Sequence, residues 1–294
     1  MIGEISALTT AVLWSGSSLA FAGATKRVGS FYVNMTRLIF AAVMLSVTVL
    51  LLGLDFHLKS IQVVYLVISG MIGLVFGDTF LFRAYQYNSA RITMLLMSAS
   101  PAVAAVLAYF VLNERLSAWG ILGIVMTLAG IFSVVLEHSG RSSVRMTISG
   151  AGLLYGFLAA VGQGGGLIFG RMAFNEGPIN GFVAAAFRVV SATIILIPVA
   201  MMTRHYKKPV AVFQNDRRAL GMTVVGSILG PFLGITASLI AVANTDVGIA
   251  ATLMATVPII MLPLVRIIYK EHLTRKSIIG AFIAVAGVAI LFLN

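Results

Sequence analysis

Cysteine is absent from the 294-residue chain, and acidic residues are few, nine against 20 Lys and Arg. Without cysteine the chain can form neither a disulfide nor a thiolate metal site, and its redox compartment cannot be inferred. Charged residues make up only 10% of the chain and hydrophobic residues 60%, whereas a soluble domain carries about 25% charged residues. This composition, with a mean hydropathy of +1.04, excludes an ordinary soluble domain and indicates an integral membrane protein.

The shortage of acidic residues leaves a formal net charge of +11. Clustered Lys and Arg can bind nucleic-acid phosphates, but here they lie in short loops between apolar runs, where they set membrane orientation. The histidines, His57, His138, His205 and His272, lie in or beside scattered loops and do not form a metal-binding pattern. We therefore expect no metal, no cofactor and no nucleic-acid partner.

Apolar runs of about 20 residues recur along the chain, and each is long enough to cross a membrane as a helix. Because the runs are continuous and not alternating, and an isolated strand cannot satisfy its backbone in lipid, we expect helices. Breakers and charges delimit ten predicted spans, near residues 4–25, 31–53, 61–86, 92–112, 117–136, 147–171, 179–202, 218–243, 247–268 and 275–293. The segment MIGEISALTT lacks a basic region and a cleavage signal, so we expect it to begin a retained first span.

The second half of the chain repeats the first. At one constant offset the matching positions are Leu96 with Leu253, Met97 with Met254, Pro101 with Pro258, Glu114 with Glu271, Leu116 with Leu273 and Gly123 with Gly280. Because each unit holds five predicted spans, an odd number, the second copy enters the membrane in the opposite sense. The predicted fold is thus all-α, with ten transmembrane helices as two five-helix inverted-topology repeats: residues 1–138, a linker at 139–146, and residues 147–294.

Four features recur in both predicted units. Each has an Arg in its second span (Arg37, Arg188), a Pro in its fourth (Pro101, Pro258), a Glu-x-Leu-Ser/Thr motif (Glu114 to Ser117, Glu271 to Thr274) and a glycine-rich fifth span. This pattern, over essentially the whole chain, resembles the EamA-type transporters of the drug/metabolite transporter superfamily. The resemblance implies a central cavity between the repeats, alternating access, and a small polar or amphiphilic solute. Members carry amino acids, nucleotide sugars or choline, so the resemblance does not define the cargo.

The distribution of basic residues predicts the sidedness of the protein. Most Lys and Arg follow the odd-numbered spans, whereas Lys59, Arg115 and Arg171 lie on the face that carries the termini. By the positive-inside rule, a multi-pass protein of the cytoplasmic membrane with this bias has both termini outside the cytoplasm. Several EamA-type transporters are drawn with cytoplasmic termini, so the prediction differs from the family pattern.

Arg37, Asp78 and Arg188 fall well inside predicted spans, where an uncompensated charge is costly. Arg37 and Asp78 lie about 10 Å deep from the same face, so an ion pair between them is geometrically possible, with Arg83 as a rival partner. Asp78 then serves either as a cation or proton site gated by Arg37, or as half of a structural tie. Arg188 has no acidic mate within the hydrocarbon region; it either faces the solute or contacts backbone carbonyls at a broken helix.

Aromatic and amide side chains are candidates for lining the cavity. Trp14 and Gln163 lie at similar depths in the first and sixth predicted spans, and a Trp can stack on a cation or ring. Phe82 and Tyr85 follow Asp78 at helical spacing and share its face. We predict that these residues bind the solute together with Asp78 and Arg188. An interfacial Trp, an interhelical Gln and ordinary aromatic packing are the alternatives.

Glu114 and Glu271 stand just before the fifth and tenth predicted spans. A carboxylate favours the positive end of a helix dipole, and Ser117 or Thr274 can accept hydrogen bonds from free amides there. We interpret the two glutamates as structural or gating charges.

Prolines and glycines mark points of bending and close packing. Pro101 and Pro258 remove a backbone N–H within a span and predict a kink. The segment GQGGGLIFG (162–170) has no preceding strand and no following Lys-Ser/Thr, so it is not a phosphate-binding loop. Its small residues favour close helix packing.

The predicted function is a secondary active transporter for a small polar or amphiphilic metabolite, of amino-acid or amine type, with a coupling proton or cation. Inverted repeats and intramembrane charge favour this function. The alternatives are a flippase for a lipid-linked sugar and an integral-membrane enzyme, although no catalytic arrangement of residues is evident. The direction of transport, and whether the protein is a monomer or a homodimer, stay open.

Overall fold

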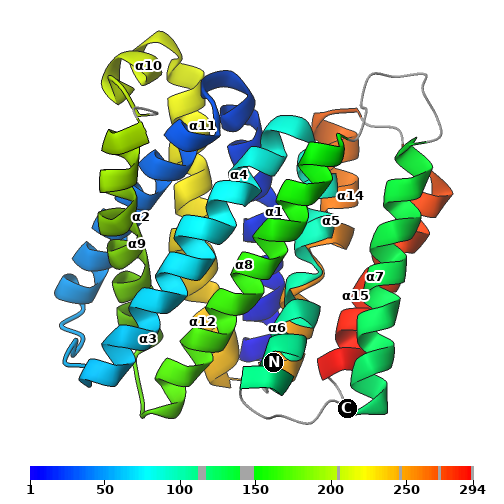
Figure 1. Cartoon of the computed structure of the whole chain (residues 1–294), viewed down its shortest axis with the longest axis horizontal. Coiled ribbons are helices and arrows are strands. Elements are labelled where there is room, and N and C mark those ends of the chain that lie inside the picture. The colour runs from blue at the N-terminus through cyan, green and yellow to red at the C-terminus, as the bar shows by residue number, and fades with distance from the viewer. Residues whose placement is uncertain (112–116, 140–148, 204–205, 245–246, 271–272, 293–294) are drawn as a thin grey trace.

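The computed structural model describes residues 1–111, 117–139, 149–203, 206–244, 247–270 and 273–292. In these ranges the chain forms helices joined by short connections, without a strand (Figure 1). Eight helical stretches among them are long and apolar enough to cross a membrane, by length and composition. The prediction of an all-α, multi-pass membrane protein is therefore confirmed.

The first half of the chain begins with two long helices. A π-helical segment interrupts the third span, a break divides the fourth, and one further helix follows. The elements are α1 (Ile2–Val28), α2 (Ser30–Leu51), α3 (Ser60–Gly70), the π-helical segment η1 (Met71–Gly77), α4 (Asp78–Tyr87), α5 (Ala90–Met97), α6 (Ser100–Val111) and α7 (Ala118–Ser139). The chain reverses between α1 and α2 at Gly29, whose φ of 94° is readily adopted by glycine.

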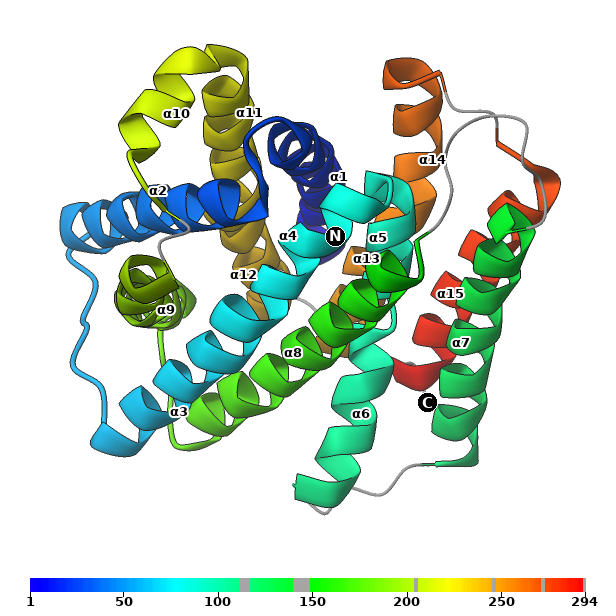
Figure 2. The ribbon, with the colours of Figure 1, turned by 45° about the horizontal axis from the view of Figure 1, so that its top comes forward.

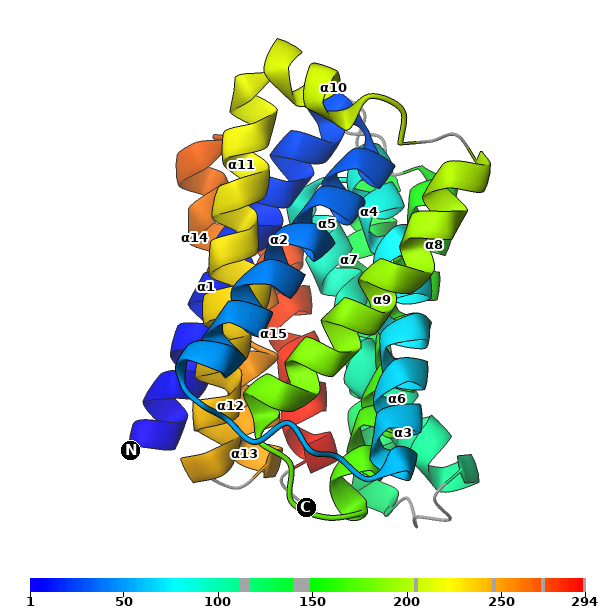
Figure 3. The same ribbon diagram turned by 90° about the vertical axis from the view of Figure 1, so that its left-hand side faces the viewer.

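The second half has a similar order of elements. They are α8 (Gly150–Asn175), α9 (Gly181–Thr203), α10 (Pro209–Asn215), α11 (Arg217–Ser227), the π-helical segment η2 (Ile228–Gly234), α12 (Ile235–Asn244), α13 (Val247–Met254), α14 (Val257–Ile268) and α15 (Arg275–Phe292). The short helix α10 lies at one end of the bundle between α9 and α11 (Figure 3). The sequence predicted no helix between the spans near 179–202 and 218–243, so this helix was missed.

Element lengths repeat between the halves. From α3 to α6 the lengths are 11, 7, 10, 8 and 12 residues, and the elements from α11 to α14 have the same lengths in the same order. In both halves, therefore, a π-helical segment of equal length follows the first helix of the third span. Such wide turns occur often at functional sites.

Helices from each half pack on the π-helical segment of the other half. α8 packs against η1, and α1 packs against η2. Glycines permit the close approach of these helices. If Gly77 carried a Cβ atom, that atom would lie only 3.2 Å from the backbone nitrogen of Gln163. Serines hold both crossings, because Ser69 Oγ donates to the Gly166 carbonyl at 2.5 Å and Ser17 Oγ donates to the Gly226 carbonyl at 2.9 Å.

Two proline-containing helices begin at interruptions. α5 ends at Met97 and α6 begins at Ser100, so Pro101 stands in the first turn of α6. Pro258 stands in the first turn of α14, after the break that follows α13. A first turn tolerates proline because its N–H groups have no helical partner. The interruptions lie where the sequence analysis placed kinks.

Helices α7 and α15 form an antiparallel pair at one edge of the bundle (Figures 1 and 2). A Cβ on Gly123 would lie 2.6 Å from the Gly287 carbonyl oxygen, and one on Gly130 would lie 2.6 Å from the Gly280 carbonyl oxygen. Thr127 Oγ1 lies between these contacts, 3.3 Å from the Ala284 carbonyl oxygen. Gly280 and Gly287 are the repeat equivalents of Gly123 and Gly130. Each glycine therefore contacts the equivalent of the other glycine on its partner helix, and the two contacts are reciprocal.

The two ends of the bundle differ in charge. α1 begins and α15 ends at the lower end in Figure 1. Lys26 and Arg27, in the last turn of α1, lie at the opposite end, where Arg27 pairs with Asp216 at 2.7 Å. The sidedness that the loop charges predict stays a prediction.

Candidate functional site

Arg37 of α2 and Asp78 of α4 form an ion pair inside the bundle. Arg37 Nη2 donates to Asp78 Oδ2, and both side chains are buried. Asp78 is the first residue of α4, directly after the wide turns of η1. Of the two pairings that the sequence allowed for Asp78, with Arg37 or with Arg83, the structure contains the one with Arg37. Arg83, the rival partner, instead places its guanidinium carbon 5.8 Å from the ring centre of Tyr155.

The Arg37 guanidinium has partners on several sides. Its Nε donates to Asn34 Oδ1 at 3.2 Å, three residues earlier on the same helix. Its carbon lies 4.9 Å from the Phe82 ring centre and 5.8 Å from that of Phe21. Cations are attracted to aromatic faces at such distances. Arg37 is therefore a well-satisfied charge, held by hydrogen bonds, a carboxylate and two rings.

Gln163 of α8 reaches the same carboxylate from the second half of the chain. Its Nε2 donates to Asp78 Oδ1 at 2.6 Å and to the Gly73 carbonyl of η1 at 3.2 Å. Both oxygens of Asp78 thus have a donor, one from each half of the chain. Gln163 was predicted to line a cavity; the structure makes it a direct partner of Asp78.

Arg188 of α9 lies beside this cluster. A Cβ added to Gly73 would be 3.4 Å from Arg188 Nη2 and 3.9 Å from Gln163 Oε1, so both side chains lie against Gly73 of η1. Arg188 Nε is buried, and no described residue is its hydrogen-bond partner. The residue as a whole is only half-buried. Arg188 therefore differs from Arg37: among the described residues no carboxylate is hydrogen-bonded to it, and it shares the charge of Asp78 with Arg37.

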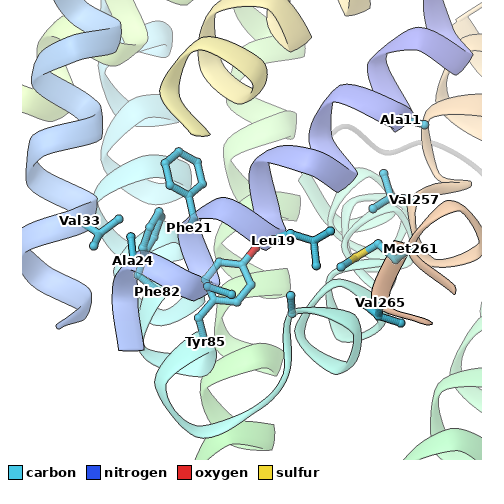
Figure 4. Close-up of a cluster of buried hydrophobic side chains, with 12 residues drawn as sticks. Ala11, Leu19, Phe21, Ala24, Val33, Phe82, Tyr85, Val257, Met261 and Val265 are labelled. Atoms are coloured by element: carbon cyan, nitrogen blue, oxygen red, sulfur yellow. The ribbon is translucent and has the colours of Figure 1, made fainter. Parts of the chain in front are cut away.

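The predicted aromatic residues take two different positions. Phe82 and Tyr85 are each 1% exposed and lie in a buried cluster with Phe21, whose ring centre is 5.2 Å from that of Phe82 (Figure 4). Trp14 is less buried and contacts η2, since a Cβ on Gly234 would lie 2.6 Å from its Cδ1. In this conformation Phe82 and Tyr85 support the ion pair from the core side.

The helix starts after the repeated Glu motifs are capped as predicted. Ser117 Oγ accepts a hydrogen bond from the Gly120 amide at 3.0 Å, and Thr274 Oγ1 accepts one from the Ser277 amide at 3.2 Å. The two predicted structural or gating charges, Glu114 and Glu271, lie outside the described residues.

Sequence reasoning missed several members of the cluster. Asn34 precedes Arg37 by almost one helical turn, a spacing that predicts neighbouring side chains, so its contact could have been found. The Gly73 carbonyl and the Phe21 ring carry no comparable signal. Their roles depend on how η1 and α1 pack.

The cluster combines one carboxylate with two guanidinium groups. Among the described residues, Asp78 is the one acidic residue that is buried, and no group of three or more His, Cys, Asp or Glu could hold a metal ion. The arrangement can therefore bind a charged group or exchange a proton. It does not offer the set of oxygen ligands that a resident metal ion requires.

Comparison with known proteins identifies the class. The model of the EamA-like transporter family matches residues 1–136 and 150–293, so the chain belongs to this family of multi-pass membrane transporters. It is similar to the uncharacterized transporter YyaM of Bacillus subtilis, with 26% identity over 58% of this chain and 54% of that protein. The chain spans only about half the length of that relative.

Two further relatives match over shorter stretches. They are the probable magnesium transporters NIPA2 and NIPA1 of Arabidopsis thaliana, 38% and 37% identical over 26% and 24% of this chain, and 24% and 21% of their own lengths. A crystal structure of another protein, 20% identical in sequence, matches 99% of this chain and 96% of its own chain with a TM-score of 0.68. That similarity concerns the fold alone. The family and the relatives are described as transporters, not as enzymes.

Proposed function

We propose that the protein is a secondary active transporter that moves a small polar or amphiphilic metabolite, of amino-acid or amine type, across the cytoplasmic membrane. The observation that carries this proposal is the cluster of the buried Arg37 and Asp78 with the half-buried Gln163 and Arg188, which joins the two halves of the chain next to a π-helical segment. Charged residues inside a membrane protein commonly mark substrate or ion pathways.

The proposed architecture is ten transmembrane helices in two inverted five-helix repeats, residues 1–138 and 147–294 with a linker at 139–146. Two features support it: the matching lengths from α3 to α6 and from α11 to α14, and the reciprocal glycine contacts between α7 and α15. The ninth and tenth spans would be formed by α13 with α14 and by α15.

The proposed mechanism is a rocking motion of the two repeats around the cluster. Inverted-repeat transporters bind their solute near the repeat interface, where helices are interrupted. Here η1 and η2 supply the interruptions, and Gln163 and Trp14 contact them from the opposite repeats. In this proposal Trp14, Asp78, Gln163 and Arg188 face the solute, while Phe82 and Tyr85 support Asp78 from the core. The breaks at Pro101 and Pro258 serve as hinges.

Asp78 is the proposed coupling residue. Protonation of its carboxylate would weaken both the Arg37 ion pair and the charge-assisted hydrogen bond from Gln163. Because these contacts join α2, α4 and α8, losing them would loosen the contact between the halves. Proton binding and solute movement would thereby be linked.

Transport into liposomes tests the proposal. The purified protein is reconstituted, and flux of labelled amino acids, amines and Mg²⁺ is measured with and without a pH gradient. The variant is Asp78→Asn, and Asp216→Asn, which changes a partly exposed acid paired with Arg27 at the end of the bundle, is the matched control. We expect gradient-driven solute flux in the wild type and the control, and no response to the gradient in Asp78→Asn.

Two results would count against the proposal. Unchanged pH-dependent flux in Asp78→Asn would exclude Asp78 as the coupling residue. Flux of Mg²⁺ without flux of any organic solute would favour the activity for which NIPA2 and NIPA1 are named. We do not expect that result, because Mg²⁺ prefers an octahedron of oxygen ligands, whereas two guanidinium groups lie beside the single carboxylate of this cluster.

A further inference from the structure

The two repeat-equivalent arginines have very different surroundings. Arg37 has an acceptor for Nε in Asn34 and a counter-charge in Asp78. The residue three positions before Arg188 is Ala185, a buried side chain that offers no acceptor. The first residue of α12 is Ile235, at the place that Asp78 occupies at the start of α4. The second half therefore lacks both groups that satisfy Arg37.

No group of the cluster replaces these missing partners. Both carboxylate oxygens of Asp78 are already engaged, one by Arg37 and the other by Gln163. Ser191 Oγ is itself a donor to the Arg188 backbone carbonyl at 3.0 Å. Arg188 Nε thus stays without a partner among the described residues, and the cluster carries one positive charge in excess.

A guanidinium that shares its single nearby carboxylate with Arg37 and leaves a buried N–H without an acceptor is costly to the protein. Its presence is understandable if the counter-charge comes from outside the chain. The residue is half-buried as a whole, so part of it is open to an approaching group. A guanidinium presents its N–H groups in a planar fork that matches the two oxygens of a carboxylate.

We propose that Arg188 binds a carboxylate group of the transported solute. This inference rests on the proposed function and narrows it, because the solute is then a carboxylic acid or an amino acid and not a simple amine. A monocarboxylate would neutralise the excess charge of the cluster and supply the acceptor that Nε lacks. A simple amine would meet a positively charged site whose single carboxylate is already occupied.

Matched sets of small molecules separate these solute classes. Each set contains an amino acid, the amine that lacks its carboxylate and the acid that lacks its ammonium: leucine, isopentylamine and 4-methylpentanoate; phenylalanine, phenethylamine and 3-phenylpropanoate. Thermal unfolding of the purified protein is measured with each compound, with acetate and with inorganic phosphate, because a ligand of the folded state raises the melting temperature. The variants are Arg188→Gln and Arg188→Lys. Arg83→Gln, at an exposed arginine beside Tyr155, is the control.

We expect stabilisation by the members that carry a carboxylate and none by the amines. In Arg188→Gln the carboxylates should bind about tenfold more weakly or worse, with an intermediate loss in Arg188→Lys, which keeps the charge without the fork. Arg83→Gln should behave as the wild type. Stabilisation by amines that persists in Arg188→Gln, binding of phosphate alone, or no stabilisation by any carboxylate would each overturn the inference.

A measurement without ligand gives a second test. If Arg188 is held as a binding group, Arg188→Met should raise the melting temperature of the ligand-free protein, because an unpaired buried charge is replaced by an apolar side chain of similar length. A large fall in melting temperature would make Arg188 a structural residue and overturn the inference. The proposed transport function has its own test. It is wrong if the reconstituted wild-type protein transports no solute at all, whatever the result for Arg188.

Discussion

Gln163 on α8 donates a hydrogen bond to Asp78 on α4 with an Nε2 to Oδ1 distance of 2.6 Å. The two residues come from opposite halves of the chain and meet where α8 crosses η1. Gln163 also binds the Gly73 carbonyl of η1 at 3.2 Å, so a single amide ties the wide turns and the carboxylate together. A change at Gln163 should therefore affect both the stability of the protein and the contact between its two halves.

Gln163→Ala should destabilise the protein by about 1–3 kcal/mol, because it leaves a buried carboxylate oxygen without its donor. Chemical unfolding of the purified protein in detergent measures the change. Gln86→Ala, at an exposed position on the same helix as Asp78, should have little effect. Equal stability of the two variants would show that the Gln163 contact contributes nothing.

The Arg37 and Asp78 side chains should be energetically coupled. Arg37→Gln or Asp78→Asn alone leaves an unpaired charge in the bundle and should cost about 3–5 kcal/mol. The double variant should lose less than the sum of the single losses, with a coupling energy of about 0.5–3 kcal/mol. A thermodynamic cycle of unfolding free energies measures this coupling, and additive losses would contradict it.

The glycine contact between α7 and α15 should not tolerate a methyl group. A Cβ on Gly123 would lie 2.6 Å from the Gly287 carbonyl oxygen, so Gly123→Ala should cost about 1–3 kcal/mol through overpacking. Gly221 has no atom within 4 Å of an added Cβ, and Gly221→Ala should stabilise the protein by about 0.4–1 kcal/mol. Melting temperatures of the two variants should therefore shift in opposite directions.

The exposed end of α11 should contribute a pH-dependent stability. The Ala219 backbone amide and Arg27 hold the pKa of Asp216 below its ordinary value of 3.8. Because the pKa is lowered in the folded state, the contribution of the carboxylate is present above pH 3.8 and is lost as the pH falls through the native pKa. Asp216→Asn should therefore melt below the wild type at neutral pH, and the difference should disappear in acid.

Melting curves of both proteins across this pH range measure the effect. A difference in melting temperature that persists at the lowest pH would assign the loss to side-chain geometry and not to charge.

Sidedness has a direct test in cells. Because most Lys and Arg residues follow the odd-numbered predicted spans, we expect both termini outside the cytoplasm. A reporter that is active only in the periplasm, fused to the C-terminus, should be active. Activity of a cytoplasm-only reporter at that position would reverse the predicted orientation.

Hydropathy predicted the helices closely, because each apolar run must satisfy its own backbone in lipid. The span predicted near 61–86 is the interrupted rod Ser60–Tyr87. The Arg37 to Asp78 pairing was also accessible, since depth along a helix follows from residue number. The caps at Ser117 and Thr274 followed from local sequence alone.

The wide turns and the contacts made across them could not be predicted in this way. Neither glycine content nor Pro231 distinguishes a π-helical segment from a bend, since η1 contains no proline and η2 does. The meeting of Gln163 with Asp78 depends on the angle at which α8 crosses η1. Helix α10 was missed because its seven residues lie within a polar linker.

The amino-acid sequence by itself determined the membrane environment, the helical class and the internal duplication, and it placed Arg37 and Asp78 at a common depth where they could pair. These properties depend on composition, periodicity and depth, which are local to each segment. Tertiary structure decided that Gln163 donates to the second oxygen of the Asp78 carboxylate and that Arg188 lies beside the cluster, its Nε without a hydrogen-bond partner among the described residues. That difference arises because helices from opposite halves cross at η1, and no local pattern records which side chains such a crossing brings together.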